Sequence, residues 1–165
     1  MGVTFMVSTP KPKTPIIRAS KINHKSGVLH PLARFVTEET AALLLNLQLD
    51  EIYRIECWQH VVYVHGKGVS KFVSYADFPP ILGVEAPTHQ DYLRWRKRWK
   101  KHWKISQAPE FWANFYTQQF KNASTESNLL AWGKLVAAVK SVLSVVAVER
   151  LRKAYRYEKY FWENF

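Results

Sequence analysis

The residues of this 165-residue chain whose types best suit metal binding or catalysis lie between positions 51 and 77. Cys57, His60 and His65 have side chains that bind zinc, but a fourth ligand is missing, and positions 57 and 60 fall on opposite faces of a continuous strand. A nucleophilic cysteine also needs a neighbouring base and a lowered pKa, and the spacing here selects no base. We therefore expect no metal, no cofactor and no covalent catalysis at Cys57.

Acidic side chains in the same region raise a second alternative. Two or three carboxylates near a lysine can hold a divalent metal in a nuclease, and Glu51, Glu56 and Asp77 with Lys67 or Lys71 form such a set. This pattern arises by chance in many domains. The main expectation is a protein that is not an enzyme, and a small metal-dependent nuclease is the alternative.

The most distinctive pattern is the stretch DYLRWRKRWKKHWK at 91–104, where seven of fourteen residues are Lys or Arg. On an α-helix its tryptophans fall on one side with Tyr92, and its cations cover roughly the opposite side. Like charges four residues apart each destabilise a helix by about 0.2–0.5 kcal/mol, and a negatively charged partner would relieve this repulsion. The candidate binding residues are Arg94, Arg96, Lys97, Arg98, Lys100, Lys101 and Lys104.

The tryptophan stripe of this segment has two interpretations. An aromatic stripe at helical spacing usually packs into a core, which leaves the basic side facing water. Alternatively, one or two tryptophans stay exposed beside the cations, where they would stack on nucleic-acid bases or lie at a membrane interface. The candidate stacking residues are Trp95, Trp99 and Trp103.

The C-terminal stretch ERLRKAYRYEKYFWENF repeats the combination of basic and aromatic residues. Val148, Leu151, Tyr155, Phe161 and Trp162 fall on one side of a helix, and we expect that side to face inward. The two basic helices would form one positive surface if they packed side by side. The candidate binding residues on the outer side are Arg152, Lys153, Arg156 and Lys159.

The elements that must position these residues indicate an α+β fold. Residues 1–27 are rich in Pro and Lys and have no acid, so we expect a flexible basic arm. Residues 28–165 are predicted to form one domain. It would consist of an α+β part at 28–83, followed by a basic helical part at 89–165.

Alternation of side-chain types predicts a small antiparallel β meander in the first part. Its strands are expected at 52–58, 60–65 and 69–75, and the sequence HGKG at 65–68 provides a turn in which either glycine can take positive φ. The two prolines of FPPILG at 78–83 end the meander, because proline cannot continue a hydrogen-bonded ladder.

Periodic apolar residues predict one short helix before the meander and several after it. Thr37 can cap the short helix, Pro109 can open a later one, and either Ser124 or Thr125 can cap the last. The later helices are expected at 89–104, 109–121 and 125–148, with an extension of the last to 163.

Charge dominates the functional expectation, because a net charge of +11 and a pI near 9.8 indicate an anionic partner. The leading hypothesis is a non-enzymatic protein that binds RNA or DNA. The alternatives are an assembly factor or accessory subunit that docks on an acidic protein, and a peripheral membrane protein. No stretch is apolar enough for a membrane span. The single cysteine excludes an intrachain disulfide, so we expect a cytoplasmic protein.

Overall fold

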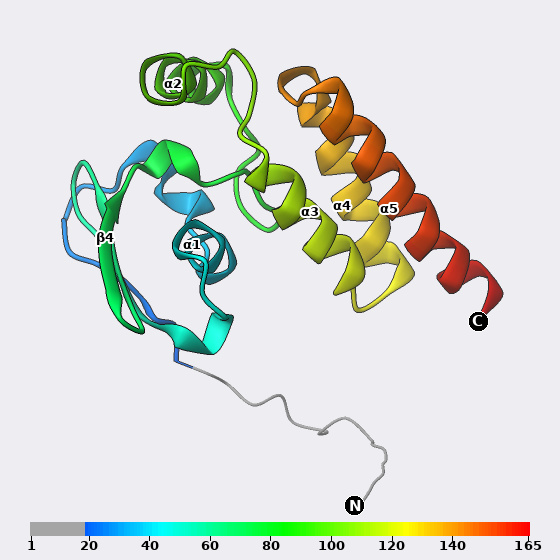
Figure 1. Ribbon diagram of the computed structural model, residues 1–165, viewed down its shortest axis with the longest axis horizontal. Coiled ribbons are helices and arrows are strands. Elements are labelled where there is room, and N and C mark those ends of the chain that lie inside the picture. Colours follow the sequence, from blue (N-terminus) through cyan, green and yellow to red (C-terminus); the bar gives the residue numbers. More distant parts are fainter. Residues whose placement is uncertain (1–18) are drawn as a thin grey trace, which may run out of the picture.

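The computed structural model describes residues 19–165, and it has an α+β fold with a helical C-terminal half (Figure 1). A four-stranded mixed sheet has the order β1-β2-β3-β4. The three strands predicted from alternation are present as an antiparallel meander, and Gly68 takes the positive φ of +73° in the β3–β4 turn. The strands are β1 Ile22–His24, β2 Ile52–Cys57, β3 Val62–Gly66 and β4 Val69–Val73.

Strand β1 corrects the prediction of a flexible arm over 1–27. It pairs in parallel with β2, in the register Ile22 to Ile55, and so adds an edge strand that the sequence pattern did not reveal. A three-residue strand has little intrinsic preference, and its conformation is fixed by the backbone of the strand beside it. The rest of the predicted arm, residues 1–18, lies outside the described residues.

Helices cover one face of this sheet, while the other face is open (Figure 1). Helix α1 (Glu38–Leu45) begins as predicted at Thr37, whose hydroxyl accepts a hydrogen bond from the Thr40 N–H at 3.1 Å. The short 3-10 helices η1 (Pro31–Phe35), η2 (Leu49–Glu51) and η3 (Tyr75–Asp77) connect these elements. On the open face Phe72 is 64% exposed, whereas Ile55 and Val64 are buried on the covered face.

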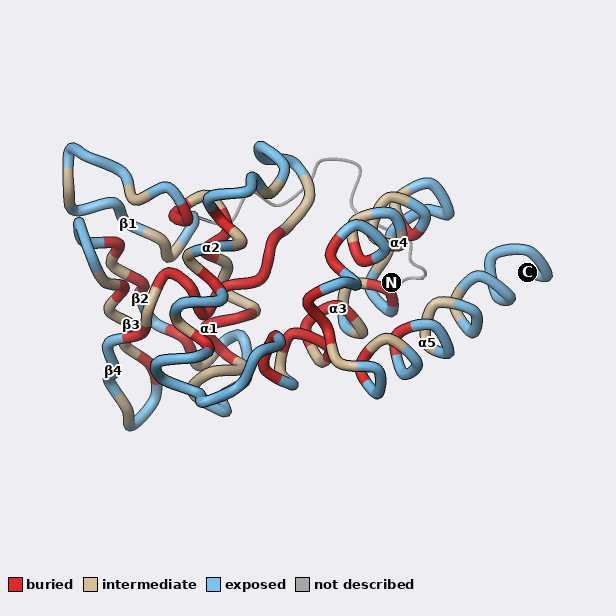
Figure 2. The backbone as a smooth tube through the Cα atoms, turned by 90° about the horizontal axis from the view of Figure 1, so that it is seen from above, coloured by how far each residue is buried: buried red, intermediate tan, exposed pale blue. Residues whose placement is uncertain are grey.

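The C-terminal half consists of helices that pack beside the sheet layer. Helix α2 (His89–Arg98) continues into the π-helical turn η4 (Trp99–Trp103), and α3 (Phe111–Lys121) follows. Helix α3 lies between the sheet layer and the last two helices (Figure 1). Buried residues of both halves belong to one continuous apolar cluster, which Figure 2 shows as the red interior.

The prediction of one helix over 125–148 is wrong, because the structure has two. Helix α4 (Glu126–Val139) begins at Thr125, one of the two predicted caps, and is followed by the 3-10 helix η5 (Lys140–Val142). Helix α5 (Val145–Asn164) then starts at Ser144, whose hydroxyl accepts from the Ala147 N–H at 3.0 Å. A serine that bonds the backbone in this way favours a new helix N-terminus over a continuing helix.

Candidate anion-binding surface

The helix that carries the basic segment starts at a capping box. The Thr88 hydroxyl accepts from the Asp91 N–H at 3.2 Å, and the Asp91 carboxylate accepts from the Thr88 N–H at 2.9 Å. Asp91 is buried, and it also binds Arg34 at 2.5 Å and Arg94 at 3.3 Å. Burial alone would raise the pKa of Asp91, but the bonds from Arg34 and Thr88 outweigh it, so the pKa is lowered. Asp91 is therefore ionised, and its ion pair with Arg34 joins α2 to η1.

Two of the three candidate stacking residues are part of the core. Trp95 and Trp99 are both 0% exposed, and each contacts Trp112 of α3 edge to face, with ring centroids 5.4 and 5.3 Å apart. A completely buried ring cannot stack on a base, so the structure corrects the stacking hypothesis for both residues. The tryptophan stripe therefore anchors α2 between η1 and α3. On the η1 side, Phe35 contacts Trp95.

Trp103 differs from the other two and is 38% exposed. The segment predicted as a regular helix over 89–104 ends in a turn with i to i+5 hydrogen bonding, and Trp103 is the last residue of that turn. The ring leans on Phe111 with centroids 6.2 Å apart. Lys104 then ends the segment with a left-handed φ of 58°. Among the three candidates, only Trp103 keeps a ring surface open to solvent.

The structure separates the cations of this segment into paired and unpaired ones. Arg98 bonds the buried Asp77 of η3 at 3.4 Å, and Arg94 bonds Asp91. The Arg96 guanidinium lies 5.8 Å from the centre of the Tyr92 ring. The Lys104 ammonium donates to the carbonyl of Lys101 at 2.9 Å. Among the described residues, the side chains of Lys97, Lys100 and Lys101 in this segment have neither an ion pair nor a hydrogen bond, and all three are exposed.

Four of these cations meet in a hollow of about 250 Å³, which we call the basic hollow. One wall is formed by one face of α2 and η4. Its four cations have the spacing i, i+3, i+4 and i+7 and are Arg94, Lys97, Arg98 and Lys101. The facing wall comes from η1, the β2–β3 turn and η3, and it contains no acidic side chain. The residues of that wall are His30, Leu32, His60, Ser74, Tyr75 and Ala76.

His30 is the most constrained titratable group of the basic hollow. Its Nδ1 accepts from the Leu32 N–H at 3.0 Å as the N-cap of η1, and its ring stacks on Tyr75 with centroids 4.3 Å apart. Burial and then the charge of Arg94 lower the pKa of His30. The ring therefore stays neutral near pH 7. Sequence reasoning missed His30 and Tyr75, because only the fold brings these residues of separate elements beside the basic helix.

The second predicted basic surface lies on α5 and is also only partly paired. Arg152 bonds Glu149 at 3.3 Å and Lys159 lies 4.0 Å from Glu163, both exposed pairs within the helix. Within the described chain, Lys153 and Arg156 have no ion-pair partner. All four predicted cations are exposed, which suits contact with an anionic partner.

The aromatic side of α5 divides into a buried and an exposed part. Leu151 is buried, and Tyr155 packs on Phe120 of α3 with centroids 5.4 Å apart. The expectation that Phe161 and Trp162 also face inward is wrong, because they are 42% and 41% exposed on an end of the helix that extends past its neighbours (Figure 2). The exposed aromatic residues at this end are Tyr157, Tyr160, Phe161, Trp162 and Phe165.

The two basic surfaces do not form one continuous face. In both views α2 lies over the sheet half, while the C-terminal end of α5 lies at the opposite end of the molecule, with α3 between them (Figures 1 and 2). An elongated anionic partner would have to pass over α3 to contact both. Each surface is therefore a separate candidate.

The residues considered for catalysis are not gathered into a site. Cys57 is buried, and burial raises the pKa of its thiol, which disfavours the thiolate that a nucleophile needs. Glu51 and Glu56 bind Lys67 and Arg54 in separate ion pairs. Across residues 19–165, no three His, Cys, Asp or Glu side chains are grouped as a metal site would require.

Comparisons with protein-family models, with curated proteins and with solved structures give no match to this chain. In the part of the chain that the structure describes, no helix combines the length and the apolar character needed to cross a bilayer.

Proposed function

We propose that this protein is a non-enzymatic nucleic-acid-binding protein that holds phosphate groups in the basic hollow. The observation that supports this most directly is the alignment of four cations along one helix face, opposite a wall that contains no acidic side chain. Lys97 and Lys101 have no ion-pair partner in the described chain, so a phosphate would relieve their mutual repulsion at i, i+4. Arg94 and Arg98 are held in place by buried carboxylates and would need little reordering.

Exposed aromatic side chains support a nucleic acid over other anions. Bases of single strands stack on aromatic rings beside cations, and this combination occurs at Trp103 and again at the end of α5. There Tyr160 lies about one turn after Arg156, and Trp162 lies about one turn after Lys159. A cytoplasmic location belongs to the same proposal, and the single free cysteine fits a reducing compartment.

The test is anisotropy titration of fluorescent single-stranded RNA, single-stranded DNA and duplex DNA at several salt concentrations. Each phosphate contact contributes a log–log salt slope of about −0.7 on single strands and −0.9 on duplex. Replacing Lys97 and Lys101 by Ala should make the slope shallower by up to about 1.4–1.8. The matched control replaces Lys67 and Lys71, two exposed lysines of the β3–β4 hairpin, and should leave the slope almost unchanged. Undetectable affinity at about 50 mM salt, or equal effects of both double variants, would refute the proposal.

A further inference from the structure

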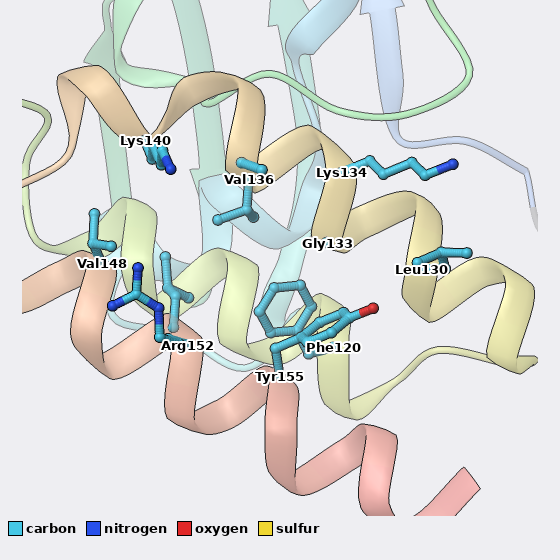
Figure 3. Close-up of a pocket in the computed structure, with 11 residues that line it drawn as sticks. Phe120, Leu130, Gly133, Lys134, Val136, Lys140, Val148, Arg152 and Tyr155 are labelled. Carbon is cyan, nitrogen blue, oxygen red and sulfur yellow. The ribbon is translucent and has the colours of Figure 1, made fainter. Parts of the chain in front are cut away.

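A second concave surface lies between α4 and α5 (Figure 3), and it shares no lining residue with the basic hollow. It is a groove of about 300 Å³ with an apolar floor formed by Phe120 of α3, Val136 of α4 and Leu151 of α5. The floor residues are buried, but Leu130 on the α4 side is 45% exposed and Ala137 is exposed as well. The groove therefore presents apolar surface to solvent that no other described part of the chain covers.

Both walls of the groove are helical stripes. Leu130, Gly133, Lys134 and Ala137 follow the spacing i, i+3, i+4 and i+7 on α4. The α5 wall follows the same spacing with Val148, Leu151, Arg152 and Tyr155. Parallel stripes on two neighbouring helices form the kind of groove that receives a third helix.

Gly133 allows α5 to pack closely against α4 at one point of the groove. The Tyr155 ring packs directly on Gly133, so closely that a Cβ placed there would lie 2.5 Å from Tyr155 Cε1. A second hollow shares Leu130 and Tyr155 and extends the groove toward Glu126 and Lys159. Because α4 has 14 residues, the extended groove is about 20 Å long, which matches about four turns of helix.

Cations surround the apolar floor. Lys134, Lys140 and Arg152 line the main groove, and no acidic side chain does. Lys134 and Lys140 have no ion-pair partner within residues 19–165, and Arg152 has only the exposed Glu149. This charge favours an anionic occupant and disfavours a second copy of a chain whose net charge is +11.

We propose that the groove binds an amphipathic α-helix of a partner protein, with apolar side chains at i, i+3, i+4 and i+7 and Asp or Glu along its edges. The apolar stripe would cover Leu130 and Ala137, and the acids would reach Lys134, Lys140 and Arg152. A helix fits better than a single acyl chain, because the groove is open along its length and would leave much of a thin ligand in water. This site is separate from the basic hollow, with which it shares no lining residue.

The test uses the full chain, labelled with ¹⁵N, and a model helix as the probe. The probe is a peptide of about 18 residues with a Leu stripe flanked by Glu, and its counterpart has every Glu replaced by Lys. We expect the acidic peptide to shift the amide signals of 130–140 and 148–155. The basic peptide should shift them little. Signals that move on α2 instead, or no binding of the acidic peptide, would overturn the proposal.

A matched pair of variants on α4 locates the binding. Ala137 and Ala138 are both exposed on the same helix, but only Ala137 lines the groove. Ala137→Glu should weaken binding of the acidic peptide by about tenfold or more, because it places a like charge and an unpaired polar group in the contact. Ala138→Glu makes the same charge change and should alter the affinity by less than about twofold.

Equal effects of the two variants would overturn the proposal, as would a groove occupied by dodecanoate and not by the acidic peptide. The Lys97 and Lys101 double variant should bind the peptide as the unchanged chain does. Loss of oligonucleotide binding in that variant and loss of peptide binding in Ala137→Glu are therefore separate results.

Discussion

Two regions of the molecule have the same kind of sequence but different environments. One is the continuous segment of α2 and η4, and the other is helix α5. Both place aromatic residues at helical spacing among Lys and Arg. On α2 the stripe of Trp95 and Trp99 is completely buried, whereas on α5 the aromatic residues after Tyr155 are exposed. Helical periodicity identifies the side that avoids water, but it does not identify the element that covers that side.

The difference follows from which elements lie opposite each helix. Trp112 of α3 and Phe35 of η1 close over the α2 stripe. Helix α5 packs on α3 through its first half, and its C-terminal turns extend beyond α3 and α4 (Figure 1). The rings that contact Phe161 belong to Tyr157, Tyr160 and Phe165 of the same C-terminal segment. Phe161 and Trp162 are 42% and 41% exposed, so this end of α5 is available to a partner.

The largest expected effect comes from truncating the buried stripe. Trp99→Ala should lower the free energy of unfolding by about 3–5 kcal/mol, because it removes a large side chain from a packed core and leaves a cavity. Trp103→Ala is the matched control four residues away. It should lower the free energy of unfolding by less than about 1 kcal/mol, since its ring is partly solvated. Urea denaturation measures both, and similar losses would show that the two rings are not in different environments.

The next effect concerns the buried acid at the start of α2. Asp91→Asn keeps a capping oxygen but removes the charge that holds Arg34 and Arg94, so the free energy of unfolding should fall by about 1.5–3 kcal/mol. The lowered pKa of Asp91 means that its contribution is present above the unfolded value of about 3.9 and is lost as pH falls through the folded value.

The variant should therefore lose less stability than the unchanged chain between pH 7 and about pH 3, measured by urea denaturation at each pH. The control is Glu56→Gln, which breaks the exposed pair with Arg54 and should change stability by at most about 1 kcal/mol. An Asp91 variant as stable as the Glu56 variant would contradict the role of a buried anchor.

The sequence predicted those parts of the fold that depend on neighbouring residues in the chain. Alternation gave the three strands of the meander, and hydroxyl residues at 37 and 125 gave two helix starts. Strand β1 was missed because its partner is about 30 residues away in sequence. The break before Ser144 was missed because apolar residues continue on both sides of it, so periodicity does not change there.

The candidate site divides in the same way. Charge clustering identified Lys97 and Lys101, and the structure shows both exposed at the basic hollow. It could not show that Arg98 bonds Asp77, or that His30 and Tyr75 form the opposite wall, because these contacts join separate elements. The π turn that ends at Trp103 left no mark in the hydrophobic pattern.

A smaller effect tests the wall that faces α2. His30 accepts a bond from Leu32 N–H through Nδ1, so His30→Ala should lower the free energy of unfolding by about 1 kcal/mol. Because the folded pKa of His30 lies below the unfolded value of about 6.5, protons bind the unfolded chain more strongly. Above the unfolded pKa, His30 is neutral in both states and does not reduce the free energy of unfolding. As pH falls below the unfolded pKa, His30 lowers the free energy of unfolding.

His30→Asn retains an acceptor for the Leu32 N–H and cannot titrate. Its free energy of unfolding should therefore fall less than that of the unchanged chain between pH 7.5 and about pH 5. His24→Asn makes the same substitution at an exposed position of β1 and is the matched control. If His24→Asn and His30→Asn have the same effect, His30 does not carry this dependence.

The smallest expected effect on stability is on the exposed end of α5, where the comparison with α2 is sharpest. Trp162→Ala should change the free energy of unfolding by less than about 0.5 kcal/mol, because the ring is 41% exposed on a helix end that extends past the other elements of residues 19–165. If this ring stacks on a base, as the proposed function implies, the same variant should weaken binding of a single-stranded oligonucleotide by about 1–3 kcal/mol. Trp162→Phe keeps a stacking surface and should restore most of that affinity. Thermal melts and anisotropy titrations of both variants separate the two roles: a large loss of stability would mean that Trp162 is packed as Trp99 is, and unchanged affinity would restrict nucleic-acid binding to the basic hollow.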